Sequence, residues 1–128
     1  MATGAEDVRE VMDLAFDLYN QKNVEQFLEC FAPDFSNFYI DNSLLSEGRI
    51  DADALRALYD GGMTPVIDQR HMTVRMFGDT ALVTGYVTGS ITGPEGVKAQ
   101  GPWRFTALLV KASGPWQIVH NHWSPLAP

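Results

Sequence analysis

The sequence predicts a single α+β domain in which helices precede a mostly antiparallel sheet. Helical periodicity is confined to the first half of the 128-residue chain. Four strand-like segments fill the second half, and the turns between them are too short to hold the crossover helices of a parallel sheet. We expect the sheet to curve around a long first helix and leave a cone-shaped interior, because short helices cannot cover a long four-stranded sheet uniformly.

Three helices are predicted in the first half. Residues 6–20 repeat apolar side chains at helical spacing and carry acidic residues in their first turn, which suits the positive end of a helix dipole. Residues 24–31 form a shorter helix with one apolar side, which Pro33 ends. A third helix begins at a capping aspartate, Asp51 or Asp53, and ends at a Gly-Gly pair.

About five strands are predicted. Residues 34–41 alternate and are rich in Phe and Tyr, so they form a strand between the second and third helices, followed by a loop. The other four strands are separated by turns that contain Gly or Pro, so strands that are neighbours in sequence pair as hairpins. These four strands span residues 66–77, 80–92, 100–111 and 116–124.

The composition argues against several functions. Nine Lys and Arg against sixteen Asp and Glu give a formal net charge of −7, which argues against nucleic-acid binding and against docking on anionic membrane. No apolar run approaches the ~20 residues of a membrane span. The N-terminus has no basic region and no apolar signal core, so we expect a cytoplasmic protein. The one cysteine, Cys30, is expected to pack as a small core residue.

The final strand carries the most specific motif, WQIVHNHWS at residues 116–124. It resembles the last strand of SnoaL-like domains in the nuclear transport factor 2-like superfamily, which are related to ketosteroid isomerases and polyketide cyclases. It also looks like the end of the calmodulin-dependent protein kinase II association domain. Segments 31–35, 78–85 and 104–110 fit too, so the resemblance implies one cystatin-like domain over residues 1–128. The superfamily includes isomerases, dehydratases, cyclases, transport factors and assembly domains, so the reaction is left open.

The resemblance also assigns the faces of the strands. The position that matches Trp123 lines the pocket in ketosteroid isomerases, so alternation places Val119 and Asn121 inside with it and Ile118 outside. This assignment assumes that no β-bulge intervenes, since a bulge inverts the alternation beyond it. The residues expected to point inward from the other strands are Phe35, Asn37, Tyr39 and Asp41; Val83, Gly85 and Val87; and Trp103, Phe105, Ala107 and Leu109.

No catalytic set of the resembling families is complete in this chain. Ala15, Trp103 and Tyr39 stand where ketosteroid isomerases carry their catalytic groups, and the pocket arginines of the kinase association domain are also missing. Dehydratase-like members use a histidine on an early long strand and an aspartate from the end of the first helix. His71 stands near the place of that histidine, and Asn20 stands at the place of the aspartate. Asn20 can orient an imidazole but cannot stabilise its charged form. His71 is therefore the best candidate general base, and the alternative is an exposed or backbone-bonded strand histidine.

The inward aromatic residues predict an apolar cavity that holds a small apolar or moderately polar molecule. Gly85 removes side-chain bulk from one wall. Asn37, Asn121 and Asp41 supply a few polar groups. The alternative is that the aromatic residues fill the cone as ordinary core. The expected ligand-binding residues are Asn121, Trp123, Trp103, Phe105, Asn20, Asn37, Val83 and Val87.

Two classes of function stay open. One is a cofactor-independent lyase, isomerase or cyclase that acts on an uncharged apolar molecule. His71 is then its base, and Tyr39, Asn121 or Asp41 orients a substrate oxygen. The other is a non-catalytic module of the same fold that only binds a ligand or only mediates association. We see no phosphate-cradling loop and no full metal set, so we expect no cofactor.

His120 and His122 stand two residues apart on the last strand, a spacing that can bind a metal ion. Nothing near them in sequence supplies a third ligand, so we expect no metal site and interpret the pair as packing on the outer face. Arg104 and Thr106 share this face. An open sheet of this size rarely leaves its outer side bare, so we expect a homodimer through Arg104, His120 and His122.

Overall fold

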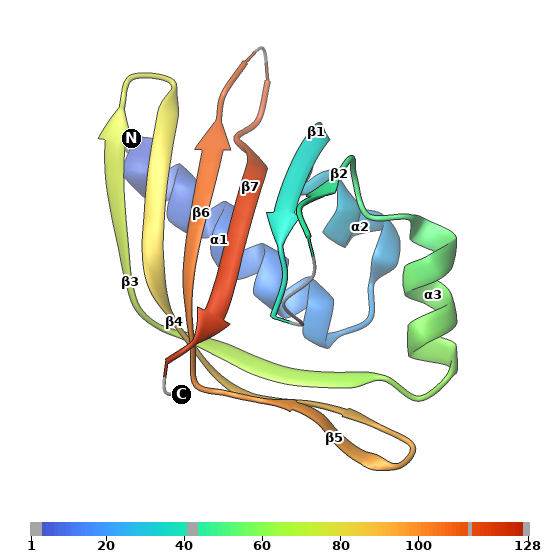
Figure 1. Ribbon diagram of the computed structural model, residues 1–128. Coiled ribbons are helices and arrows are strands. Elements are labelled where there is room, and N and C mark those ends of the chain that lie inside the picture. The colour runs from blue at the N-terminus through green and yellow to red at the C-terminus, as the bar shows by residue number, and fades with distance from the viewer. Residues whose placement is uncertain (1–3, 41–43, 113, 127–128) are drawn as a thin grey trace.

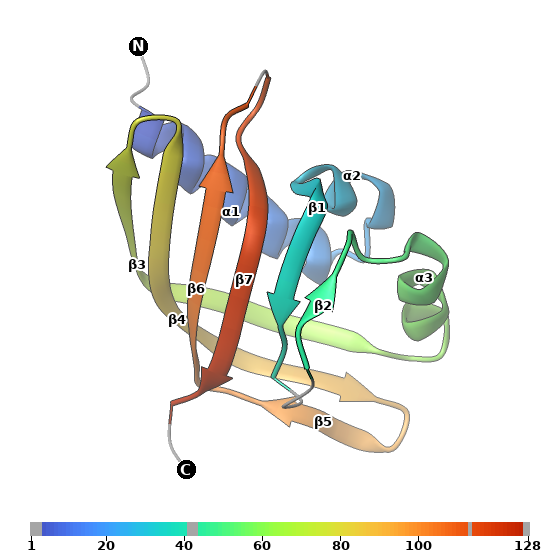
Figure 2. The same ribbon diagram turned by 45° about the horizontal axis from the view of Figure 1, so that its top comes forward.

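Within residues 4–40, 44–112 and 114–126, which the computed structural model describes, the chain forms three helices and a seven-stranded sheet (Figures 1 and 2). The sheet is strongly curved and unclosed, and the helices lie on its concave side. This arrangement confirms the predicted α+β fold. The helices are α1 (Gly4–Asn20), α2 (Val24–Glu29) and α3 (Ala52–Asp60). The strands are β1 (Phe31–Phe38), β2 (Ser46–Glu47), β3 (Thr64–Phe77), β4 (Thr80–Gly93), β5 (Gly96–Gln100), β6 (Trp103–Val110) and β7 (Gln117–Pro125).

Helix α1 crosses the concave face of the sheet because its apolar residues lie along one side. Glu6 and Asp7 occupy its first turn, where negative charge is favourable. Its buried residues recur at helical spacing and pack into the curve of the sheet. These residues are Val8, Met12, Ala15, Phe16 and Leu18.

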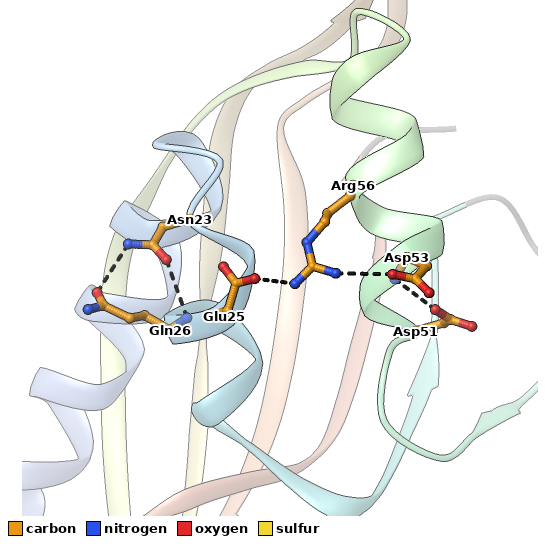
Figure 3. A network of polar contacts seen from close by, with 6 residues as sticks. All are labelled: Asn23, Glu25, Gln26, Asp51, Asp53 and Arg56. Carbon is orange, nitrogen blue, oxygen red and sulfur yellow. Dashed lines mark hydrogen bonds and ion pairs between the residues drawn. The ribbon is translucent and has the colours of Figure 1, made fainter.

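Helices α2 and α3 are held at the surface by caps and ion pairs. Asn23 caps α2 and Asp51 caps α3, each by accepting hydrogen bonds from backbone N–H groups of the first turn. Figure 3 shows Arg56 of α3 paired with Glu25 of α2 and with Asp53 of its own helix. Because these side chains are exposed, the ion pairs orient α3 against α2 and contribute little to stability.

The strand order is β2-β1-β7-β6-β4-β3, with β5 paired on β4. Strands β1 and β7 run parallel, and the other pairs in the described part of the chain are antiparallel. Strand β2 lies in the predicted loop. Strand β6 lies within the predicted strand at residues 100–111. Strand β5 was not predicted, and it is separated from β6 at Pro102, which has no backbone N–H to pair.

The second helix is shorter than predicted and the strand after it begins earlier. Helix α2 ends at Glu29, and β1 begins at Phe31 and contains Pro33. Pro33 is accommodated because the pairing of β1 with β7 is irregular between Phe31 and Ser36.

A β-bulge at Val119 changes the alternation of β7. Consecutive residues of β6 pair with His120 and then with Ile118, so Val119 is the extra residue. Ile118 is 1% exposed and faces inward. Asn121 and Trp123, beyond the bulge, also face inward and line the cavity described below. The prediction that Ile118 faces outward is wrong, because it counted through position 119 as regular strand.

A second bulge lies in the middle of β3, where His71 and Met72 stand opposite Gly85 of β4. His71 has a φ of 55°, a left-handed conformation that residues other than glycine rarely adopt. A Cβ atom at Gly85 would lie 2.8 Å from Cε1 of Phe105 and 3.2 Å from Cα of Met72. Glycine is therefore required at the point where the bulged backbone comes close to β4.

The core fills the space between α1 and the sheet. Val83, Val87, Ala107 and Leu109 are each 0% exposed. They project from β4 and β6 toward α1, as the predicted alternation requires. In the part of the chain that the structure describes, no helix is both long enough and apolar enough to cross a membrane.

Candidate functional site

A cavity of about 260 Å³ lies between the helices and the concave face of the sheet. All three helices and strands β1, β3, β4 and β7 contribute to its wall. Tyr39 and Leu58 line the cavity and are also 37% and 47% exposed. These two side chains therefore mark the side on which the cavity opens to solvent.

The wall of this cavity is almost entirely apolar. Its polar groups come from two amides, Asn37 and Asn121, from two phenols, Tyr19 and Tyr39, and from the indole of Trp123. Among the described lining residues there is no carboxylate, imidazole, ammonium, guanidinium or thiol. A few polar groups in an apolar wall are typical of a small-molecule site.

The two amides lie side by side. Asn37 of β1 pairs in register with Asn121 of β7 across the parallel strands, and both line the cavity. Oδ1 of Asn121 is buried without a hydrogen-bond partner in the described part of the chain. Buried polar atoms are nearly always paired in folded proteins, so this oxygen stands out in the wall.

The phenols form a group on the helical side. The hydroxyl of Tyr59 donates to the backbone oxygen of Tyr19 at 2.8 Å. Burial raises the pKa of Tyr19 well above its usual range, and its hydrogen bond and proximity to Tyr39 add to this effect. Burial also raises the pKa of Tyr59, with a smaller contribution from Tyr39. Tyr19 and Tyr59 are therefore neutral at physiological pH and can donate hydrogen bonds but cannot act as bases.

The structure brings four of the predicted site residues together in this cavity: Asn37, Tyr39, Asn121 and Trp123. Asp41 lies outside the described residues.

The predicted wall residues on β4 and β6 are buried but do not line the cavity. Phe16 of α1 packs edge-on against Phe105, with ring centroids 5.7 Å apart. Trp103 packs against Trp123 at 5.8 Å. These contacts fill that end of the cone, so the residues form ordinary core. The predicted ligand-binding residues that the structure places in the core are Trp103, Phe105, Val83 and Val87.

Asn20 does not face the cavity as a ligand-binding residue either. Its Nδ2 donates to the backbone oxygen of Ile67 at 2.7 Å, and its Oδ1 accepts from the backbone N–H of Ile67 at 3.1 Å. Both ends of the amide are therefore occupied in joining the end of α1 to β3. The amide is thereby held against the backbone of β3 and not against an imidazole.

His71 does not reach the cavity. Its side chain is exposed, and its ring meets that of Tyr86 edge-on at 6.3 Å on the outer face of the sheet. It lines a separate hollow there with Arg104 and Thr106. The bulge in β3 explains the difference, because it breaks the alternation on which an inward position depended.

His120 and His122 lie on the outer face, as expected. Nδ1 of His120 lies 2.7 Å from Oγ of Ser36, and both imidazoles contact the ring of Phe38, at 5.7 and 5.2 Å. The two histidines therefore pack against Ser36 and Phe38 on this face. Within the residues described, no three His, Cys, Asp or Glu side chains are grouped as a metal site.

Several cavity residues were not identified from the sequence. Ile118 was assigned to the wrong face. Tyr19, Phe27 and Leu58 were recognised only as apolar helix positions, since periodicity does not tell a core-facing residue from a cavity-facing one.

Comparison with solved structures shows the same fold in proteins of low sequence identity. An uncharacterised protein with a cystatin-like fold from Caulobacter vibrioides aligns with a TM-score of 0.79 and 21% identity, over 98% of this chain and 91% of its own. The CaMKII hub of S. rosetta aligns with a TM-score of 0.77 and 22% identity, over 97% and 98%. An NTF2-like protein from Cytophaga hutchinsonii aligns with a TM-score of 0.78 and 12% identity, over 98% and 100%.

A search of curated proteins finds no significant match. The family model for the SnoaL-like domain matches residues 8–128. This match includes most of α1, the curved sheet and the final strand whose motif carries the resemblance. The chain belongs to the SnoaL-like domain family.

Proposed function

We propose that the protein binds an uncharged, largely apolar small molecule in the cavity between its helices and its sheet. The composition of the wall carries this proposal: its described residues are apolar except for two amides, two phenols and an indole. Such a wall holds an apolar ring by burial. It disfavours a charged molecule, because no described lining residue can pair with the buried charge.

The same composition favours binding over proton abstraction. A general base must lie within hydrogen-bonding reach of the proton that it removes. His71 is exposed on the opposite face of the sheet, and the raised pKa of Tyr19 keeps that phenol protonated. The non-catalytic alternative is therefore the function that this geometry supports best.

Equilibrium dialysis with naphthalene, quantified by chromatography, tests the proposal. Ala15 lines the cavity and is 5% exposed, so Ala15→Leu places three more carbon atoms in it. We expect the variant to bind naphthalene at least about tenfold more weakly, since a filled cavity cannot admit the ring without strain. Ala57→Leu, on the exposed side of α3, is the matched control. No binding by the wild type, or equal binding by both variants, would refute the proposal.

We further propose that the outer face of the sheet forms a homodimer contact through Arg104, His120 and His122. Phe38 and Tyr86 are each 39% exposed, and the rings of Phe38 and the two histidines already form one cluster. A second copy of the same face would bury this aromatic surface.

Light scattering at high micromolar concentration tests the dimer. The wild type is expected to be dimeric. His122→Glu is expected to be monomeric, because it removes an imidazole that packs on Phe38 and requires the contact to desolvate a carboxylate. Ala15→Leu, inside the cavity, should leave the mass unchanged. A monomeric wild type contradicts this proposal and leaves ligand binding unaffected.

A further inference from the structure

Oδ1 of Asn121 is a hydrogen-bond acceptor that the protein itself leaves unused. The residue lies in the cavity wall on β7, and the oxygen is buried without a partner in the described part of the chain. An amide oxygen taken out of water without a replacement hydrogen bond lowers stability, so folded proteins leave few such groups. This oxygen therefore requires an explanation.

The neighbouring side chains do not provide one. Asn37 stands opposite Asn121 in the register of β1 and β7, yet no hydrogen bond joins the two amides. The wall does contain the indole N–H of Trp123 and the phenol hydroxyls of Tyr19 and Tyr39, but none of them donates to Oδ1 of Asn121. What remains is a donor that enters the cavity from outside the chain.

We infer that the cavity is built for an uncharged ring compound that carries a hydrogen-bond donor, a hydroxyl or a ring N–H, on the edge that meets Asn121. This inference rests on the proposed function. An acceptor-only ligand leaves Oδ1 unpaired. A donor pairs the oxygen and removes the penalty that the empty protein carries.

The volume limits the size of this compound. A dry cavity of roughly 150 Å³ admits benzene, and the cavity here measures about 260 Å³. The ratio corresponds to roughly ten to twelve non-hydrogen atoms, the size of a two-ring compound. Three compounds have that size and differ in their polar group. Naphthalene has none, 2-naphthol carries a hydrogen-bond donor, and 2-methoxynaphthalene carries only an acceptor.

Equilibrium dialysis of these three compounds tests the inference. The measured quantity is the ratio of the naphthalene Kd to the 2-naphthol Kd, in the wild type and in Asn121→Leu. Comparing the two proteins cancels the difference in hydrophobicity between the compounds. We expect the ratio to fall about fivefold or more in Asn121→Leu, which follows from the net strength of one hydrogen bond. The 2-methoxynaphthalene ratio should change far less.

Gln117→Leu is the matched control, because it replaces an amide by leucine on the same strand but outside the cavity wall. It should keep the wild-type ratio. Asn121→Ala gives the same comparison if the leucine variant does not fold, as judged by circular dichroism.

The outcomes separate the two proposals. The inference is overturned if Asn121→Leu leaves the 2-naphthol ratio unchanged. It is also overturned if this variant loses more affinity for 2-methoxynaphthalene than for 2-naphthol. In either case, naphthalene binding by the wild type still supports the proposed function. Failure of all three compounds to bind the wild type overturns both.

Discussion

Asn20 is the residue whose replacement best distinguishes a structural role from a catalytic one. The family resemblance suggests that it orients a histidine, but its amide makes two hydrogen bonds with the backbone of Ile67, at 2.7 and 3.1 Å. Each is worth about 0.5–1.5 kcal/mol net. Asn20→Ala should therefore reduce the free energy of unfolding by roughly 1–3 kcal/mol, since it also leaves the N–H and C=O of Ile67 without these partners.

Urea unfolding followed by circular dichroism measures this loss. A loss of about 2 kcal/mol corresponds to a fall in Tm of roughly 5–10 °C for a domain of this size. Gln21→Ala, at the exposed neighbouring position, should change stability by less than about 0.5 kcal/mol. Asn20→Asp should be nearly as destabilising as Asn20→Ala, because a carboxylate cannot donate to the carbonyl of Ile67. Wild-type stability in Asn20→Ala would refute the reasoning.

Three further predictions concern the core and its charges. Gly85→Ala should reduce stability by about 1–3 kcal/mol in urea unfolding, because its Cβ atom would lie 2.8 Å from Cε1 of Phe105; an unchanged midpoint would contradict the close contact. Burial raises the pKa of the Cys30 thiol to about 11, so its reaction with a disulfide reagent at pH 8 should be roughly a hundredfold slower than in the urea-unfolded chain; equal rates would show that the thiol is accessible. Desolvation, with a contribution from the charge of Asp17, raises the pKa of the Asp13 carboxyl in the folded protein. Ionisation of Asp13 therefore reduces stability as the pH rises above the pKa of an aspartate in the unfolded chain. Asp13→Asn should then raise the free energy of unfolding at pH 7, by less than about 1 kcal/mol, and have no such effect at pH 3; the same gain at both values would exclude a charge effect.

The sequence predicted the elements well because each depends on local chemistry. The apolar stripe of α1, the aspartate cap of α3 and the turns between the long strands are all visible in neighbouring residues. Errors occurred where tertiary pairing decides. The residues around Val119 carry no pattern that indicates a bulge, yet because of that bulge Ile118 faces inward on the same strand as Asn121.

The site was predicted in part for the same reason. Asn121 and Trp123 were placed correctly in the interior because the assignment starts from Trp123, and the bulge at Val119 lies before both residues on the strand. Trp103 was expected in the wall and is packed core, since Trp123 lies against it. Whether an inward side chain meets a neighbour or open space depends on the sizes of residues from other elements, which periodicity does not report.

The single extra residue in β7 decides which chemistry the interior contains. Ile118 faces inward, so the same sequence paired regularly through Val119, without the bulge, would turn the next two alternating positions, His120 and His122, toward the helices. An amide and an indole would then be exchanged for two titratable imidazoles, with no substitution at any of these positions. In a fold of this kind, a change in strand pairing can alter the chemistry of the interior more abruptly than a point replacement.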